Sequence, residues 1–290
     1  AVTERKRTGT RGRHVRRRSR IPLVLAVAVA LAAIGFATAK GLPSQARGSG
    51  TAHVVVPVVN RPAIASAEPS AAAISPKPVW QPRNSAELPP GPPIPAAGSG
   101  QFHVIPGASV RSGTGSLHTY TVEVEDGIAV PGGDDRFGAI VQATLADPRS
   151  WIGGGTIAVR RIDTGTPRFH VRFTSQRTAR ARCGFDIPVD VSCRVGPDVY
   201  LSAARWIRGA VAYHGDLDSY RQYMVNHEVG HAFGNGHRAC PVNGGPAPVM
   251  MQQTFSVSDN EILDISGGSA EGVVVHRDGK VCTPNPWPFP

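Results

Sequence analysis

Three histidines and one glutamate fall within eleven residues, at intervals that suit a metal-dependent hydrolase. His227 and His231 are four residues apart, so on a helix their imidazoles share one face and can reach the same small cation. Catalytic zinc needs a third protein ligand and one open position for water, and His237 can supply that ligand. Glu228 follows the first histidine and can act as a general base without binding the metal. The pattern predicts a catalytic zinc site.

The chain that follows the expected helix must bring the third histidine back to the metal. Gly234 can adopt a positive φ at no steric cost, which allows the helix to end sharply. Further on, Met250 and Met251 follow the segment 246–249 and predict a methionine in a tight turn beneath the histidines. A bare H-E-x-x-H pattern also occurs in unrelated amphipathic helices. The added glycine, histidine and methionine make coincidence a poor explanation.

Taken together, these features resemble the signature of the metzincin metalloproteases. Its members in this chain are His227, Glu228, His231, Gly234 and His237, followed by Met250 or Met251. The resemblance covers residues 101–290 in outline and is most specific between residues 220 and 252. It implies an α+β domain with a twisted mixed β-sheet and two main helices above a cleft. A small, irregular C-terminal subdomain is implied below the cleft.

The chain departs from one variant of this pattern. Some metzincins have a tyrosine ligand two residues after the methionine, where Gln252 or Gln253 stands here, so a tyrosine-switched site is not expected. More narrowly, several segments resemble an uncharacterised family of membrane-anchored actinobacterial proteins, catalogued as a domain of unknown function. These segments are 226–231, 240–241, 246–254 and 284–288. The second resemblance implies the same architecture and brings no substrate with it.

The ligand set indicates a reaction. Three neutral histidines leave Zn²⁺ its full charge, which lowers the pKa of a bound water towards ~7, and Glu228 would pass the proton of that water to the departing amine. We therefore expect a zinc metalloendopeptidase with one catalytic ion, acting on a peptide or protein. The alternative is a zinc-stabilised cell-envelope binding domain without turnover. The presence of Glu228 favours the enzyme, because a purely structural site needs no base.

The residues that would stabilise negative charge on the substrate carbonyl are less evident. Tyr213 and His214 are candidates, although both suit structural roles better. The backbone of an edge strand expected near 199–203 is a third candidate. An edge strand would also let an extended peptide bind by β-pairing.

The net charge of +10 is concentrated at the N-terminus. Residues 1–20 contain nine Lys or Arg and one acid, Glu4, which gives 9 − 1 = +8 and leaves +2 for the other 270 residues. The uncharged residues 21–39 follow, and as a helix they would extend roughly 28 Å, close to the thickness of a bilayer core. This length favours a transmembrane anchor with a cytoplasmic N-terminus, whereas Ala37-x-Ala39 fits a cleaved signal segment.

Either interpretation of residues 21–39 places the rest of the chain outside the cytoplasm, as a single-pass membrane protein or as a secreted one. It also explains the basic tail without nucleic acid, so no nucleic-acid partner is expected. Residues 40–100 are rich in Pro, Ala and Ser and predict a linker. Residues 101–290 then form the metalloprotease domain, which we expect to be a monomer.

Within the domain, hydrophobic periodicity predicts a strand, a helix, several strands and a second helix, which is an α+β order. Strands are expected at 120–125, 157–162, 169–173 and 199–203. One helix is expected at 137–145 with Asp135 as its cap, and a second at 217–233 with Asp216 as its cap.

The four cysteines all come after residue 180 and fit an oxidising compartment. Of three possible connectivities, we favour Cys183 with Cys193 and Cys240 with Cys282. Zinc binding by these thiols is the rival interpretation. It is less suitable because no C-x-x-C spacing is present and the histidine site is complete without them.

Overall fold

The computed structural model describes residues 84–184, 189–266 and 275–290. The basic tail, the apolar segment at 21–39 and most of the expected linker lie outside these ranges. Among the described residues, no helix is both long enough and apolar enough to span a bilayer.

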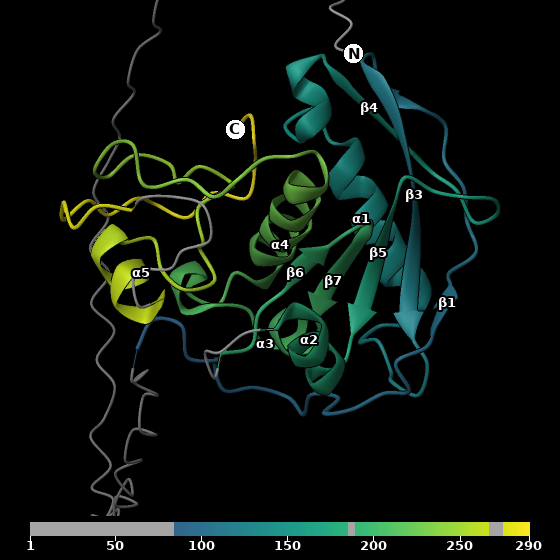
Figure 1. The fold of residues 1–290 in the computed structure, drawn as a ribbon, viewed down its shortest axis with the longest axis horizontal. Helices are drawn as coiled ribbons and strands as arrows, with labels where there is room; N and C mark the ends of the chain where they lie inside the picture. The colour runs from purple at the N-terminus through teal and green to yellow at the C-terminus, as the bar shows by residue number, and fades with distance from the viewer. Residues whose placement is uncertain (1–83, 185–188, 267–274) are drawn as a thin grey trace, which may run out of the picture. The chain divides into compact units, whose positions relative to one another are not determined.

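The described chain folds into an α+β arrangement, which confirms the expected class (Figure 1). Its strands are β1 (Phe102–Val104), β2 (Ser112–Gly113), β3 (Ser116–Glu125), β4 (Ile157–Arg161), β5 (Phe169–Thr174), β6 (Cys193–Val195) and β7 (Asp198–Ser202). Its α-helices are α1 (Asp134–Ala146), α2 (Gln176–Cys183), α3 (Ala203–Arg208), α4 (Leu217–Ala232) and α5 (Asp259–Ser266). Short 3-10 turns occur at Trp151–Gly154 and Val211–Tyr213.

The strands form one mixed, twisted sheet. Their order is β2-β4-β3-β5-β7-β6, and β1 pairs with part of β3. The central strands β4, β3, β5 and β7 are parallel, while β2, β1 and β6 pair antiparallel with their neighbours. Figure 1 shows α4 between this sheet and the C-terminal segment that carries α5. The sheet therefore supports one side of α4 and leaves the other side to the C-terminal segment.

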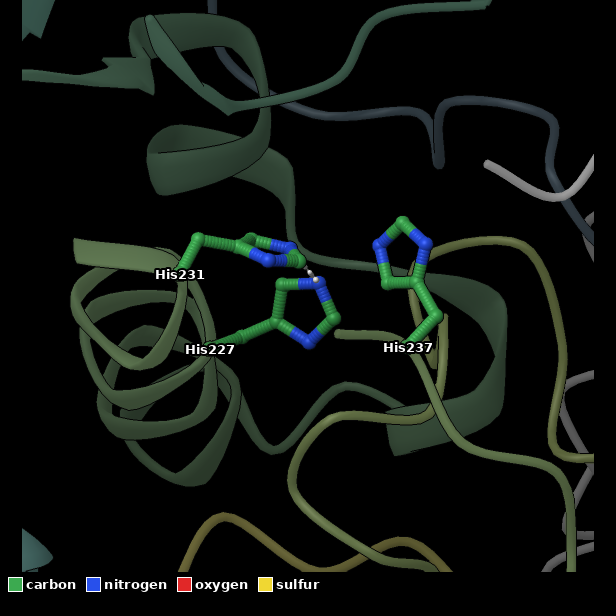
Figure 2. Close-up of side chains that lie close together, drawn as sticks. All are labelled: His227, His231 and His237. Carbon is green, nitrogen blue, oxygen red and sulfur yellow. Dashed lines mark hydrogen bonds between the residues drawn. The ribbon is translucent and has the colours of Figure 1, made fainter. Parts of the chain in front are cut away.

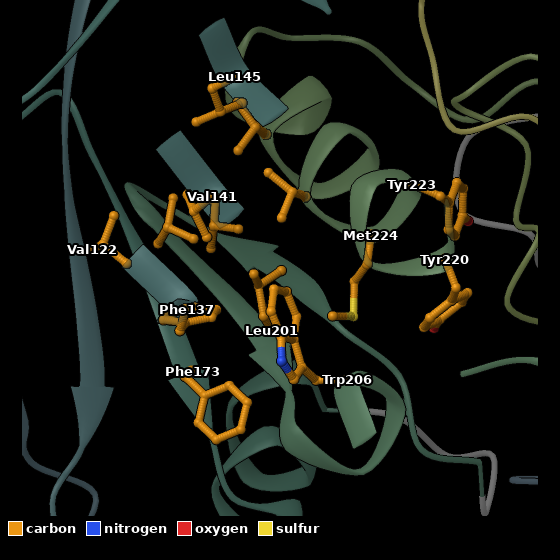
Figure 3. Close-up of a cluster of buried hydrophobic side chains, with 14 of the residues drawn as sticks. Val122, Phe137, Val141, Leu145, Phe173, Leu201, Trp206, Tyr220, Tyr223 and Met224 are labelled. Carbon is orange, nitrogen blue, oxygen red and sulfur yellow. The ribbon is translucent and has the colours of Figure 1, made fainter. Parts of the chain in front are cut away.

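The main core joins α1 and α4 to one face of the sheet. Phe137 of α1 lies edge-on to Phe173 of β5 and Trp206 of α3, at ring-centroid distances of 5.3 and 4.9 Å. Figure 3 shows these rings with Met224 of α4 in the same cluster, and all four side chains are buried. Burial of each such side chain contributes roughly 1.5–3 kcal/mol, so this packing holds α4 firmly against the sheet.

The opposite face of the sheet is buried around Glu123, although β3 has the alternating pattern of a half-buried strand. Glu123 accepts hydrogen bonds from Thr121, His170 Nδ1 and Arg172 Nε. These bonds offset the burial of the carboxylate and hold the pKa of Glu123 at about 2. Glu125 is fully buried and accepts from the amide of Ser175. Polar residues on this face therefore belong to a paired network and not to a solvated surface.

The expected elements agree well with the observed ones. The four predicted strands correspond to β3, β4, β5 and β7, and the two predicted helices to α1 and α4. Asp216 caps α4 as expected, because its side chain accepts from the amide of Ser219. Asp135 does not cap α1, which begins at Asp134 with Gly133 as its N-cap. The elements β1, β2, β6, α2, α3 and α5 have no counterpart among the predictions.

The C-terminal segment has a small core of its own. The Cys240–Cys282 disulfide lies in it, and Met251, Phe255 and Ile262 pack there. The second disulfide joins Cys183 at the end of α2 to Cys193 in β6. Both disulfides are those favoured from the sequence, and they fit a domain that folds in an oxidising compartment.

Residues 84–100, at the end of the expected linker, lie against the domain. Ala86 is fully buried within the C-terminal core. Arg205, also fully buried, donates to the carbonyl oxygens of Ala86, Glu87 and Asp190. A single guanidinium thus joins the incoming chain to α3 and to the segment before β6. The Pro-rich composition of residues 84–100 does not predict these contacts, because backbone carbonyls make them.

We predict that Arg205→Lys loosens the incoming chain. An ammonium cannot reach all the carbonyls that the planar guanidinium serves, and buried carbonyls without donors cost about 1–3 kcal/mol. Urea denaturation should show a loss of that size, with faster proteolysis near residues 84–87. The control is Arg208→Lys, because Arg208 donates to Pro92 from a more exposed position. Equal losses in the two variants would contradict a special role for Arg205.

Candidate metal centre

The helix α4 carries His227 and His231. Asn226, the residue before His227, fixes the position of the helix. Asn226 is fully buried. Its side chain accepts from Ser150 Oγ at 2.7 Å and donates to the carbonyl of Pro286 at 2.9 Å. Its carbonyl oxygen accepts from the indole of Trp151 at 2.9 Å. One asparagine therefore joins the helix to the turn after α1 and to the C-terminal segment.

The three predicted histidines come together. One ring nitrogen from each of His227, His231 and His237 lies within 4.8 Å of the corresponding nitrogens of the other two. Figure 2 shows the first two side chains projecting from neighbouring turns of α4, with His237 facing them from the loop. His227 is buried and His231 is partly exposed. The cluster thus has an inner side and a side open to solvent.

Backbone carbonyls fix which nitrogen each helical histidine presents. His227 Nδ1 lies 2.8 Å from the carbonyl of Val249, and His231 Nδ1 lies 2.9 Å from that of Asn235. A carbonyl can only accept, so both Nδ1 atoms carry the proton and donate. In the neutral imidazoles, both Nε2 atoms then present lone pairs. This is how metal-binding histidines are commonly oriented.

The spacing of these lone pairs fits a zinc ion. The Nε2 atoms of His227 and His231 are 3.3 Å apart, drawn as the dashed line in Figure 2. Two ligands at ~2.0–2.1 Å in tetrahedral geometry would be roughly 3.3 Å apart. Burial, followed by the neighbouring His237 and His231, holds the pKa of His227 well below its ordinary value, so the metal-binding neutral form is favoured. The donor set and spacing therefore fit Zn²⁺.

Gly234 ends the helix in the way the sequence predicts. Its φ is 87°, and its amide donates to the carbonyl of His231. The next amide, that of Asn235, donates to Gly230 at 3.0 Å. These two bonds form a Schellman motif, in which a left-handed residue reverses the chain after the helix. The reversal brings His237 back over the end of α4, opposite His231.

The methionine turn lies beneath the histidines, and the structure separates its two methionines. The amide of Met251 donates to the carbonyl of Pro248 and closes the turn. Met250 belongs to the main core, whereas Met251 packs in the C-terminal core. A Cβ added to Gly230 would lie 2.5 Å from the sulfur of Met250, so this methionine packs tightly on α4. Met250 is therefore the turn methionine.

Buried tyrosines of the α4 region hold the loop that follows the turn. Tyr223 donates to the carbonyl of Met251 and accepts from the amide of Gln253. Tyr213 donates to the side chain of Gln253, which is fully buried. Tyr213 therefore has a structural role. His214 is exposed, and neither Tyr213 nor His214 lines the cleft that contains the histidines.

The histidines open into a cleft of about 610 Å³. Glu228 lines its floor beside the histidines and is 6% exposed. Gly184 and residues 191–194 also line the cleft, together with four residues of the C-terminal segment, namely Gln252, Thr254, Phe255 and Ser266. The Oε1 atom of Gln252 is buried and has no hydrogen-bond partner among the described residues. The cleft thus places a carboxylate and an unsatisfied amide oxygen near the three imidazoles.

The expectation that residues 199–203 form an edge strand is wrong. They belong to β7, which pairs with β5 on one side and with β6 on the other. The strand β6 is the outer one, and its residues Cys193 and Arg194 line the cleft. A strand of three residues is too short to show a hydrophobic periodicity, so the sequence does not predict β6.

The structure is thus an α+β domain that carries a three-histidine cluster beside the carboxylate of Glu228. A family model described as "Protein of unknown function (DUF3152)" matches residues 88–290. The chain belongs to this family, which agrees with the second resemblance seen in the sequence. No curated protein matches the chain.

We predict that Gly230→Ala damages the site although alanine is ordinarily the better helix former. The new methyl would lie 2.5 Å from Met250 Sδ and 2.6 Å from the ring of Trp151. Overpacking of this kind costs about 1–3 kcal/mol, and displacement of the methionine turn should also weaken zinc binding. Thermal denaturation and zinc titration measure the two effects.

The matched control for this substitution is Gly236→Ala, because a methyl there meets open space. Its stability should stay within about 0.5 kcal/mol of the parent protein. Similar behaviour of the two variants would show that Met250 does not pack against the helix as described.

Proposed function

We propose that this protein is a metzincin-type zinc metalloendopeptidase that hydrolyses peptide bonds. The observation that carries the proposal is the convergence of three imidazole nitrogens beside Glu228, with two of them oriented by backbone carbonyls. The sheet above the cleft, the left-handed turn at Gly234 and the methionine turn at Met250 support the metzincin assignment. His227, His231 and His237 would hold the ion.

The chemistry divides between the ion and the protein. When bound, zinc would act as a Lewis acid on the scissile carbonyl and lower the pKa of a coordinated water towards ~7. Glu228 would take the proton from the attacking water and return it to the departing amine. Its position in the residue after His227, on the floor of the cleft, suits this transfer.

The walls of the cleft suit an extended peptide. In the described part of the chain, β6 pairs with β7 on one edge and with no strand on the other, so its outer edge can accept a peptide backbone.

We also propose that the domain acts outside the cytoplasm, at the cell surface or after secretion. The two disulfides support this location because such bonds persist in oxidising compartments. The apolar segment at 21–39, which would anchor or export the chain, lies outside the described residues.

The proposal predicts different results for the ligands and the base. In the full chain, His237→Ala should abolish stoichiometric zinc, because only two of three ligands remain. Glu228→Gln should retain zinc and lower the cleavage rate by about 10²–10⁴-fold, because only the proton carrier is lost. Elemental analysis measures the metal, and a peptide-library digest followed by mass spectrometry measures cleavage.

The protease proposal would be refuted if the protein binds stoichiometric zinc but the parent protein and Glu228→Gln cleave peptides equally. The alternative of a catalytically silent, zinc-stabilised binding domain would then be the better description. A parent protein that binds no zinc would contradict both.

A further inference from the structure

The charges that line the cleft are few and unequal. Among its described lining residues, Glu228 is the one acid and Arg194 is the one arginine, and there is no lysine. If the proposed function is correct, Zn²⁺ held by neutral histidines adds two positive charges. The described lining then has a net charge of +2, because Glu228 cancels the charge of Arg194. A positive cleft attracts anionic substrates and raises their rate of association.

Arg194 is rigidly placed by the elements around it. It lies in β6 opposite Val199 of β7, and the preceding residue, Cys193, is bonded to Cys183 at the end of α2. The strand pairing and the disulfide together fix its backbone beside the zinc ligands. The residue is exposed, so its side chain extends from a fixed base into solvent at the cleft wall.

The guanidinium of Arg194 has no partner in the described part of the protein. Neighbouring arginines differ in this respect: Arg180 is paired with Asp190, and Arg172 with Glu123 and Asp198. The cleft is also lined by Gln252, Thr254, Phe255 and Ser266, which provide no carboxylate. An unpaired cation on a fixed strand, in a cleft with these neutral lining residues, is suited to bind a carboxylate that arrives from outside.

We infer that Arg194 selects peptide substrates that carry a carboxylate side chain close to the bond presented to Glu228. This inference rests on the proposed function and adds the class of substrate. A peptide that pairs with the outer edge of β6 would run beside Arg194, and its side chains would alternate between the two faces of the strand. A carboxylate on the arginine side forms a charge-assisted bond, whereas a lysine there meets repulsion.

Binding measured without turnover tests the inference directly. The full-length Glu228→Gln variant, loaded with zinc, is titrated into fluorescein-labelled decapeptides based on alanine. Each peptide carries one Glu, Gln or Lys, and the position of that residue is varied along the peptide. At the best position, the Glu peptide should bind about fivefold more tightly than its Gln counterpart. The preference should vanish when Arg194→Gln is added, shift towards Lys with Arg194→Glu, and weaken as salt is raised.

The matched control is Arg160→Gln, which removes an exposed arginine on β4 outside the cleft. It should keep the full preference for the Glu peptide. Equal binding of Glu and Gln peptides, survival of the preference in Arg194→Gln, or failure of every peptide to bind would each overturn the inference. Cleavage of the same peptides by protein with Glu228 intact tests the proposed function separately. Selective binding without cleavage would refute the enzyme and keep the carboxylate site.

Discussion

Two hydrogen bonds from imidazole N–H groups to backbone carbonyls set the chemistry of the whole centre. The carbonyls of Val249 and Asn235 accept from His227 and His231, and so turn both Nε2 lone pairs towards one point. Each carbonyl is itself placed by a defined turn, the methionine turn in one case and the Schellman turn in the other. The rest of the domain holds these two turns and α4 in fixed positions relative to one another.

That support comes from opposite sides of the helix. The sheet and α1 hold α4 through the aromatic core around Phe137 and Trp206. The C-terminal segment holds its other side through buried polar groups: Asn226 donates to Pro286, and Tyr223 donates to Met251 and accepts from Gln253. Such a network is strongly orienting in a low-dielectric interior, because any misplaced member leaves an unsatisfied group.

Much of this could be predicted from the sequence because the signals were local. The i, i+4 spacing of His227 and His231, the glycine at 234 and the cap at Asp216 each act within a few residues of themselves. The four central strands were equally evident from their hydrophobic residues. Local patterns also explain why the site was easier to predict than its surroundings.

The features that were missed depend on contacts between distant parts of the chain. Arg205 reaches back 119 residues to Ala86, and nothing in a Pro-rich segment signals that its carbonyls are needed. Asn226 was visible in the sequence only as the residue before the first histidine. Its partners at 150 and 286 become apparent only in three dimensions. The outer strand was misplaced because the three residues of β6 are too few for periodicity.

The bond from Asn226 to Pro286 has a consequence for the order in which the protein is built. Gln253 likewise bonds Asn285, so both supports depend on residues some thirty to sixty positions further along the chain. During synthesis, the histidine helix emerges before the residues that brace it. These two bonds therefore form only after residues 285 and 286 have joined the folding domain.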